Sequence, residues 1–427
     1  MKVYIETFGC TFNQADSQIM AGILKENQVT LVNSPEDADM IIMNTCYVKH
    51  PTEQKVITKI QKIKTMFPEK KLLISGCMVE IDPEKLSRAA PEASWIGPHR
   101  IKSTYKIVNS IFEGERVRAT GFSTEPKVCL PKVRSNPIIH IIQICEGCDG
   151  KCTYCCTRFA RGRLQSYSSK MIKKEAEKAV SEGCKEIQLT AQDSAAYGKD
   201  TGESLAGLMN TVNEIEGDFN VRVGMMHPKS MMNDVEEIIK AFKGDKFYKF
   251  LHIPIQSGSD RVLQDMNRCH NVAEFKNIVN RFKKEIPDIS ISTDIIVGYP
   301  TENDEDFKHT LNLIDEMKPD FLHISKYMHR PGTPSSNLEE VNYKTMKKRS
   351  KAIGELKTKI SLKKNLKMVG SKQRVLVTNK GSKGGYVGRT NNYKTVIIKD
   401  AEIGSYVDVL IKDAKPTYLM ADLKNLE

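Results

Sequence analysis

The sequence lacks several features that would assign it to common classes of protein. No apolar run reaches the roughly 18 residues that a membrane-spanning helix requires. No GxxxxGK[ST] phosphate-binding loop is present, so nothing indicates hydrolysis of nucleoside triphosphates. The first residues, MKVYIETFGC, read as a strand and not as a signal peptide. Eleven cysteines without a secretory signal indicate reduced thiols that serve as metal ligands. We therefore expect a cytoplasmic protein without a membrane anchor.

Acidic residues are nearly absent from one segment of the chain. Residues 344–367 hold ten Lys or Arg and one acid, Glu355, in a chain whose 65 basic and 53 acidic residues give a net charge of +12. Such a run is usually the solvated face of a helix. A dense run of one sign repels itself unless a polyanion lies opposite. Nucleic acid is the natural partner for this segment.

Residues 148–155 read CDGKCTYC, and three thiolates at this CxxxCxxC spacing can hold three corners of a cubane iron–sulfur cluster. The fourth iron then lacks a protein ligand and can bind a substrate, as the open position of a catalytic metal does. The pattern follows an apolar run, Pro137 to Ile144, that reads as a buried strand. Tyr154 precedes the last cysteine.

Two other interpretations of these cysteines are possible. Cys145 extends the pattern to CxxCxxxCxxC, which suits a four-cysteine zinc site or a ferredoxin-like cluster. Zinc knuckles are usually separated by about a dozen residues or more, and only three lie between Cys148 and Cys152. The ferredoxin-like reading is not excluded by spacing. We treat Cys145 and Cys156 as non-ligands and expect their replacement to leave iron content intact.

A second cysteine set lies at the ends of predicted strands. Alternating strands and helices in residues 1–110 predict a parallel sheet, with strands at Val3–Thr7, Ala38–Asn44 and Lys71–Ser75. Ligands gather just past the carboxyl ends of such strands. Cys10, Cys46 and Cys77 each follow one of these strands. Three buried core cysteines are the structural alternative; we favour a second three-cysteine cluster with an open iron.

The middle of the chain repeats β/α units. Strands are predicted at 138–144, Glu186–Thr190, Phe219–Met226, Lys249–Ile255, Ile289–Gly298 and Phe321–Tyr327. Six units predict an open (β/α)6 barrel, whose active residues lie at the carboxyl ends of the strands. Polar residues there outline a cofactor or substrate region: Tyr154, Gln192, Asp193, His252, Gln256, Ser257 and Asp294.

The tail changes pattern from Gln373 onward to short alternating strands separated by Gly-rich and Asn-rich turns. Residues 366–427 hold 11 basic and 6 acidic residues, a net charge of 11 − 6 = +5. A small basic β barrel with exposed Tyr386, Arg389 and Tyr393 suits RNA binding, although such barrels also bind proteins. Since the tail supplies no cluster ligand, we expect its deletion to spare the cluster chemistry.

The motifs resemble those of the radical S-adenosylmethionine (SAM) methylthiotransferase family over essentially the whole chain. The resemblance is carried by YIETFGCTFNQADS, NTC, SGC, GCDGKCTYC, LHIPIQSGSDRVLQDMNR and DIIVGYPTENDEDF, and the tail resembles a TRAM domain. It implies an α/β fold with four segments: an N-terminal methylthiotransferase domain (1–110), a linker (111–136), a radical SAM core (137–365) and a TRAM-like domain (366–427).

The resemblance also implies two 4Fe–4S clusters. Cys148, Cys152 and Cys155 would hold the cluster that binds SAM, and Cys10, Cys46 and Cys77 the auxiliary cluster. In this family one SAM methylates a sulfur on the auxiliary cluster, and a second yields the 5′-deoxyadenosyl radical that activates a substrate carbon. Such hard steps are left to cofactors. An electron donor and a sulfur source, both unidentified, are implied as partners beside tRNA.

The segment after Cys155 resembles one branch of the family. Its Thr-Arg and Ala-Arg-Gly elements are similar to archaeal and eukaryotic enzymes that methylthiolate C2 of N6-threonylcarbamoyladenosine at position 37 of tRNA. Arg158 and Arg161 are the predicted partners of the anionic threonyl group, because arginine binds carboxylates bidentately. Isopentenyladenosine in tRNA and an aspartate of a ribosomal protein are alternative substrates. A non-catalytic iron–sulfur RNA-binding protein is the alternative from another class.

Overall fold

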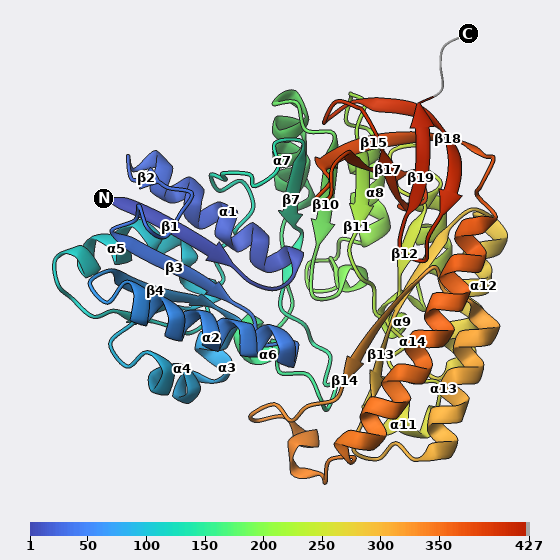
Figure 1. Ribbon diagram of the computed structural model, residues 1–427, viewed down its shortest axis with the longest axis horizontal. Helices are drawn as coiled ribbons and strands as arrows, with labels where there is room; N and C mark the ends of the chain where they lie inside the picture. The colour runs from blue at the N-terminus through green and yellow to red at the C-terminus, as the bar shows by residue number, and fades with distance from the viewer. Residues whose placement is uncertain (424–427) are drawn as a thin grey trace.

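The computed structural model describes residues 1–423 and arranges them in three parts (Figure 1). An N-terminal α/β domain lies beside a half barrel, and a small closed barrel sits at one end of the half barrel. None of the helices in this described range is long and apolar enough to cross a membrane.

The N-terminal domain is a six-stranded parallel sheet in the order β2-β1-β3-β4-β5-β6. Its strands are β1 (Lys2–Thr7), β2 (Thr30–Leu31), β3 (Met40–Thr45), β4 (Lys71–Gly76), β5 (Ser94–Ile96) and β6 (Arg118–Ala119). The helices are α1 (Thr11–Glu26), α2 (His50–Met66), α3 (Cys77–Ile81), α4 (Pro83–Ala89) and α5 (Thr104–Phe112). The three predicted strands are confirmed as β1, β3 and β4.

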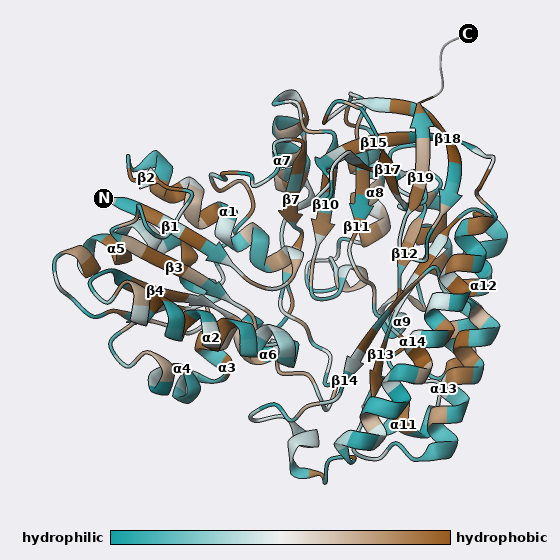
Figure 2. Ribbon diagram, in the orientation of Figure 1, coloured by the Kyte–Doolittle hydropathy of each residue, from teal (hydrophilic) through white to brown (hydrophobic). Residues whose placement is uncertain are grey.

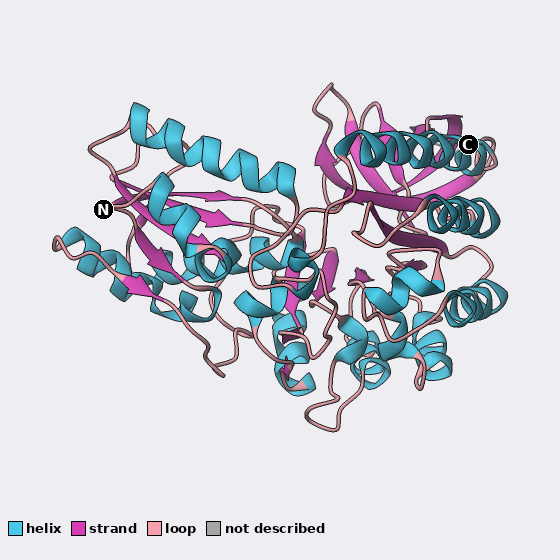
Figure 3. Cartoon of the chain, turned by 90° about the horizontal axis from the view of Figure 1, so that it is seen from below, coloured by secondary structure: helices cyan, strands magenta, loops and turns pink. Residues whose placement is uncertain are grey.

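Helices cover both faces of this sheet, as Figure 3 shows. Apolar residues of α1 and α5 pack on one face, and those of α2 and α4 pack on the other. Strand β3 is consequently buried along its whole length, as expected for a strand between two helical layers. Strand β6 joins this sheet although it lies beyond residue 110, where we had placed the domain boundary.

The half barrel contains the six predicted strands: β7 (Ile139–Gln143), β10 (Glu186–Thr190), β11 (Asn220–Val223), β12 (Phe250–His252), β13 (Ser290–Val297) and β14 (Phe321–Lys326). All pairings are parallel, in two hydrogen-bonded groups, β11-β10-β7 and β12-β13-β14. Irregular contacts join the groups, including a hydrogen bond from the Met226 N–H to the His252 carbonyl at 2.9 Å. The predicted open (β/α)6 architecture is confirmed.

The outer face of the half barrel is covered by α7 (Ser169–Ser181), α8 (Leu205–Asn213), α10 (Val235–Phe242), α12 (Val272–Glu285), α13 (Asp304–Met317) and α14 (Tyr343–Leu366). Sequence signals fix two of these starts, because Asn271 and Asn303 each form a capping box with the acidic residue three positions on. Short elements fill the loops: β8 (Cys145–Glu146), α6 (Thr157–Arg161), β9 (Gln165–Ser166), α9 (Pro228–Met231) and α11 (Asp260–Asp265).

The tail forms a closed five-stranded barrel. Its strands are β15 (Lys372–Lys380), β16 (Tyr386–Thr390), β17 (Thr395–Ile398), β18 (Tyr406–Ala414) and β19 (Leu419–Leu423). Strand β19 closes the barrel by pairing with β17 and β18. The predictions for residues 424–427 lie outside the described residues.

The small barrel docks on the amino ends of the half-barrel strands, opposite the end where active residues are expected. Tyr393 packs against Tyr248 and Phe250 at ring distances of 4.8 and 5.1 Å, and its hydroxyl donates to Glu186 at 3.2 Å. Lys394 pairs with Asp320 at 2.8 Å. The tail therefore covers the amino-terminal end of the half barrel.

These contacts correct the expectation that Tyr386, Arg389 and Tyr393 are exposed. All three are half-buried: Tyr386 packs against the barrel core, and Arg389 stacks on Tyr393 at 4.7 Å. Deleting the tail would uncover Tyr248 and Phe250, and survival of the cluster chemistry in such a truncation stays a prediction.

Helix α14 connects the two ends of the half barrel. It begins where Lys326, the last residue of β14, approaches Tyr343 at 3.4 Å. It ends where the Asn365 side chain donates to the Lys415 carbonyl of the small barrel at 2.8 Å. Figure 2 shows that much of its surface is hydrophilic. The basic segment thus spans the half barrel lengthwise.

Candidate iron–sulfur centres and their surroundings

The three N-terminal cysteines converge at one edge of the sheet. Cys10 precedes α1, Cys46 follows β3, and Cys77 opens α3 directly after β4, so three neighbouring parallel strands deliver them. Burial raises the pKa of Cys46 to about 12, and the nearby thiols of Cys77 and Cys10 add to the shift. A buried thiol keeps its proton until a metal displaces it, so iron binding here would release protons.

Two glycines make this convergence possible. Gly9 adopts a φ of +107°, and a Cβ at this position would lie 2.5 Å from the Cβ of Cys46. Gly76 adopts a φ of +92°, and its Cβ would lie 2.3 Å from the Thr45 carbonyl oxygen. Only glycine tolerates both the left-handed backbone and the close approach. The sequence pattern Gly-Cys, at Gly9-Cys10 and Gly76-Cys77, is the signal for this packing.

The second triad occupies the loop between β8 and α6. Cys148, Cys152 and Cys155 are close enough that Cys155 and Cys152 each raise the pKa of Cys148, which burial above all brings to about 12. The Cys155 N–H donates to the Cys152 carbonyl at 3.1 Å, which closes the loop. Gln192 accepts a hydrogen bond from the Gly147 N–H at 2.8 Å and so holds the start of the loop.

Within residues 1–423, no group of three or more His, Cys, Asp or Glu side chains is arranged to hold a single metal ion. A cubane cluster has a different requirement, because each thiolate binds a different iron and the sulfurs stand apart. Each triad offers three thiols close to one another, and Cys145 and Cys156 lie beside the second triad. The residues therefore fit a cluster with one open iron at each triad.

Helix α6 lies between the two triads. Its preceding residue, Cys156, packs with Cys77 in the core of the N-terminal domain. Burial raises the pKa of Cys156 to about 12, and Cys155 on one side and Cys77 on the other contribute. The start of α6 therefore lies close to a cysteine of each triad. Cys145 is also fully buried, in the half-barrel core.

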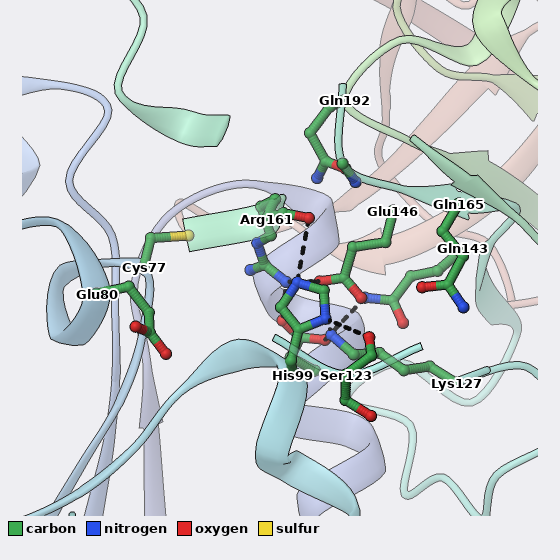
Figure 4. Close-up of polar contacts among 12 residues, drawn as sticks. Cys77, Glu80, His99, Ser123, Lys127, Gln143, Glu146, Arg161, Gln165 and Gln192 are labelled. Carbon is green, nitrogen blue, oxygen red and sulfur yellow. Dashed lines mark hydrogen bonds and ion pairs between the residues drawn. The ribbon is translucent and has the colours of Figure 1, made fainter. Parts of the chain in front are cut away.

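Arg161, at the end of α6, is the centre of a buried ionic network (Figure 4). Its guanidinium donates to Asp16 at 2.7 Å and to Glu146 at 2.8 Å. Lys127 joins the same two carboxylates at 3.1 and 2.8 Å. Two cations and two anions balance. Burial raises the pKa of Asp16, but the charges of Arg161 and Lys127 outweigh it and leave that pKa lowered.

The same arginine reaches the auxiliary triad through Asn13. Arg161 donates to the Asn13 side-chain oxygen at 2.6 Å, and this oxygen also accepts from the Cys77 thiol at 3.7 Å. Arg161 is 1% exposed. Our prediction that it meets a substrate carboxylate is therefore wrong, because its donors are taken up by buried carboxylates and an amide. The family resemblance assigned both arginines of α6 the same role, and only the packing separates them.

Arg158, on the same helix, is half-buried, and no ion pair joins it to another residue in the described range. Its predicted contact with a substrate carboxylate stays a prediction.

The predicted SAM-region residues do not share one environment. Asp193 is buried and accepts from the His227 N–H at 2.9 Å and the Ser230 hydroxyl at 2.6 Å. Ser257 is fully buried. Gln256 adopts a φ of +77°, and its N–H donates to the Asp294 carbonyl at 2.8 Å. Asp193 therefore fixes the loop after β10, and Gln256 bends the chain just before the buried Ser257.

Asp294 lies on the inner wall of the half barrel. Its neighbours along β13, Thr293 and Ile295, are buried at 4% and 1% exposure, and alternate residues of a strand face opposite ways. Asp294 accepts from the His252 ring at 2.6 Å. Burial raises the pKa of Asp294, but this hydrogen bond and the charge of His252 outweigh it, so the pKa is lowered. His323, which we did not predict, pairs in register with Asp294 and completes a polar wall.

Three segments of the chain match known families. Residues 2–97 match the Uncharacterized protein family UPF0004, residues 142–314 the Radical SAM superfamily, and residues 366–424 the TRAM domain. Among solved structures, the radical S-adenosylmethionine methyltransferase TsrM from Kitasatospora setae is similar with a TM-score of 0.58. That similarity covers 78% of this chain and 75% of the other at 12% identity, so it shows the fold alone.

Full-length relatives are more informative. The probable threonylcarbamoyladenosine tRNA methylthiotransferase of Methanothermobacter thermautotrophicus is 56% identical over 422 residues, covering 99% of both chains. The threonylcarbamoyladenosine tRNA methylthiotransferase of Homo sapiens is 35% identical over 425 residues, covering 97% of this chain and 72% of the human one. Because these relatives are similar over almost all of this chain, and 56% identical in the archaeal case, this chain belongs to the threonylcarbamoyladenosine tRNA methylthiotransferase family.

Proposed function

We propose that this enzyme adds a methylthio group to C2 of N6-threonylcarbamoyladenosine at position 37 of tRNA, using SAM and two 4Fe–4S clusters. The observation that carries the proposal is the position of α6. Cys156, which precedes α6, lies near Cys155 of one triad and Cys77 of the other. Arg161, at the end of α6, donates to the Asn13 side-chain oxygen that also accepts from Cys77. Two cysteine triads that flank one five-residue helix can act on one nucleoside.

Cys148, Cys152 and Cys155 would hold the cluster that binds SAM, and Cys10, Cys46 and Cys77 the auxiliary cluster. When bound, these groups supply the radical and sulfur chemistry that an unactivated aromatic C–H requires. The chain supplies position: Gln192 holds the loop of one triad, and Asn13 contacts a cysteine of the other. Asp294 and His252 present a polar wall for SAM or the nucleoside.

The threonyl carboxylate of the substrate needs a cation near α6. With Arg161 sealed in its ionic network, Arg158 is the remaining arginine of that helix. The basic segment of α14 and the small barrel favour tRNA as the partner, and the reaction requires an electron donor and a sulfur source. Transfer RNA and reduced thiols are consistent with a cytoplasmic reaction.

The proposal is tested with the full-length protein reconstituted anaerobically with iron and sulfide. It is incubated with SAM, dithionite and tRNA that carries threonylcarbamoyladenosine, and the digested nucleosides are analysed by mass spectrometry. We expect the methylthio derivative of threonylcarbamoyladenosine. Transfer RNA carrying isopentenyladenosine should stay unmodified. If only that tRNA were modified, the substrate would be isopentenyladenosine and the proposal would be wrong.

Two arginine variants refine the assignment of the carboxylate partner. Arg158→Ala should raise the KM for modified tRNA by about tenfold or more, since a hydrogen bond to a charged group contributes roughly 1.5–3 kcal/mol. Arg163→Ala removes the same charge from an exposed position nearby and should change the KM little. Equal effects of the two variants would remove Arg158 from the substrate site.

A further inference from the structure

Arg268 is held in the interior by a distorted loop after α11. It is 4% exposed. The residues on both sides, Asn267 and Cys269, adopt φ values of +53° and +55°. Non-glycine residues with positive φ are uncommon and strained, and two of them flank this side chain. The loop therefore adopts a strained backbone conformation at the two residues that flank the buried Arg268.

The contacts of Arg268 are unusual for a buried cation. Its guanidinium approaches the Cys152 sulfur at 3.6 Å and the Tyr154 hydroxyl at 3.4 Å, and it donates to the Pro254 carbonyl at 2.6 Å. Its Nε has no partner among the described residues. Cys152 belongs to the triad assigned to the SAM-binding cluster.

The other buried arginines of residues 1–423 each have a carboxylate partner, which Arg268 lacks. Arg161 pairs with Asp16 and Glu146, Arg330 with Glu53, and Arg349 with Glu302. Arg268 alone among these four has no carboxylate within ion-pair distance in the described chain. A buried charge without a partner is costly, commonly by several kcal/mol. An anion is therefore required beside it.

The neighbouring protein groups do not supply that anion. Asp193 is a carboxyl whose charge acts on Arg268, but burial raises its pKa, and its oxygens are engaged by His227 and Ser230. Burial, then the charge of Arg268, lowers the pKa of His227 to about 2 and that of His270 to about 4. Both rings are thus neutral at physiological pH.

A cubane cluster ligated by three thiolates carries net negative charge in its oxidised and its reduced form. We propose that Arg268 is the counter-charge of the cluster held by Cys148, Cys152 and Cys155, and that it raises the reduction potential of this cluster. The inference rests on the proposed function. Net charge and hydrogen bonds to sulfur are among the factors that set cluster potentials. Arg268 supplies both, and so makes the electron transfer that precedes SAM cleavage more favourable.

The sign of the effect separates this role from a structural one. Loss of the cation disfavours the more negative, reduced cluster and lowers the potential. A variant that merely loosens the loop admits water, which stabilises the reduced cluster and raises the potential. The measurement is an EPR-monitored redox titration of the reconstituted full-length protein without SAM. The relevant signal is the one that SAM alters in the wild-type protein.

Arg268→Gln should reduce the ratio of reduced to oxidised cluster at a fixed potential by about tenfold or more, which is about 59 mV for a one-electron couple. Arg268→Lys keeps the charge and should stay close to wild type. Arg261→Gln removes the same charge from α11, where the guanidinium pairs with Asp306 and contacts no cysteine sulfur, and should shift the potential much less.

An unchanged or higher potential in Arg268→Gln with full iron content overturns the inference. Iron retained by Arg268→Lys but lost from Arg268→Gln supports it, because the charge distinguishes the two variants. Loss of iron from both overturns it. A wild-type protein without any SAM-responsive cluster signal contradicts the proposed function itself, and is recognised before any variant is measured.

Discussion

At the scale of single residues, the surrounding groups decide what a cysteine or an arginine does in this protein. Cys145 and Cys156 are buried in two separate hydrophobic cores, at 0% and 3% exposure. Burial alone does not separate ligands from other cysteines, because Cys46 and Cys77 of the first triad are also buried, both at 5% exposure. Cys148, in contrast, lies in a partly exposed loop with two other thiols. That Cys145 and Cys156 are not ligands therefore stays a prediction.

We expect Cys145→Ala and Cys156→Ala to retain the iron content and SAM cleavage of the wild-type protein. Removing one buried sulfur should lower the free energy of unfolding by only about 1 kcal/mol, because the cavity is small. Iron analysis and quantification of 5′-deoxyadenosine check this. Loss of one cluster from Cys145→Ala would instead support the ferredoxin-like, four-cysteine arrangement.

At the scale of secondary-structure elements, both triads depend on where strands end and how the loops after them are fixed. The first triad follows β1, β3 and β4, and the second lies between β8 and α6. The two sets share no cysteine. Each should therefore be removable without the other.

Reconstituted wild-type protein should contain about eight irons, as two 4Fe–4S clusters. Replacing Cys148, Cys152 and Cys155 together by Ala should leave about four irons and abolish SAM cleavage. Replacing Cys10, Cys46 and Cys77 should also leave about four, retain SAM cleavage, and abolish methylthio transfer. Iron analysis with Mössbauer spectroscopy distinguishes these cases; a single cluster in the wild type would contradict the two-cluster proposal.

A second element-scale contact joins the linker to the half barrel. Glu175 of α7 pairs with Lys132 of the linker at 2.5 Å and with His140 of β7 at 2.8 Å. Burial raises the pKa of Glu175, but Lys132 and His140 outweigh it and lower the pKa to about 2. A carboxyl with a lowered pKa in the folded state stabilises the protein above its unfolded pKa of about 4.3. This contribution is lost as the pH falls towards 2.

Glu175→Gln should lower the free energy of unfolding at pH 7 by on the order of 3 kcal/mol. The difference from wild type should shrink as the pH falls below about 4.5, because Glu175 then takes up a proton in the unfolded chain while the folded protein keeps it ionised until about pH 2. Urea denaturation of the apoprotein at several pH values measures this. Glu177→Gln, at an exposed site two residues away, is the matched control. A difference that is constant with pH would refute the assigned cause.

At the scale of the whole molecule, α14 runs between the two opposite ends of the half barrel, and the tail covers one of them. The small barrel closes the amino end of the half barrel, while the cysteine triads lie towards the other end. Helix α14 has 24 residues and is therefore about 36 Å long. Its exposed lysines extend from the region of β14 to the small barrel. A tRNA held at the small barrel would meet this helix on the way to the triads.

Replacing Lys347, Lys359 and Lys363 together by Gln should make tRNA binding less dependent on salt. Each lost phosphate contact reduces the slope of log affinity against log salt by roughly 0.7–0.9, so three contacts reduce it by about 2–3. SAM cleavage without tRNA should be unchanged. These side chains are exposed, so the fold should be retained.

The matched control replaces Lys170, Lys174 and Lys178 of α7 by Gln, which removes the same charge from the edge of the half barrel at β7. Filter binding at several salt concentrations compares the three proteins. Equal slopes for the α14 and α7 variants would show that α14 does not follow the tRNA backbone.

The parallel sheet, the six half-barrel strands and the positions of both cysteine triads could be predicted from the sequence. These features are encoded locally, in apolar runs, in caps such as Asn303, and in Gly-Cys pairs at strand ends. The family resemblance also suggested that Arg158 and Arg161 act alike, and the pattern of the tail suggested that Tyr393 is exposed. Both suggestions concern contacts between residues far apart in the chain.

Those contacts form only when distant parts of the chain pack together. Arg161 lies 145 residues from Asp16, and Tyr393 lies 207 residues from Glu186, so no local pattern encodes either pair. Arg268 shows the same limit, since it meets Cys152 across 116 residues. Whether a charged side chain binds a ligand or seals an interface depends on which groups surround it after folding. That surrounding is set by packing between domains, not by the spacing of residues along the chain.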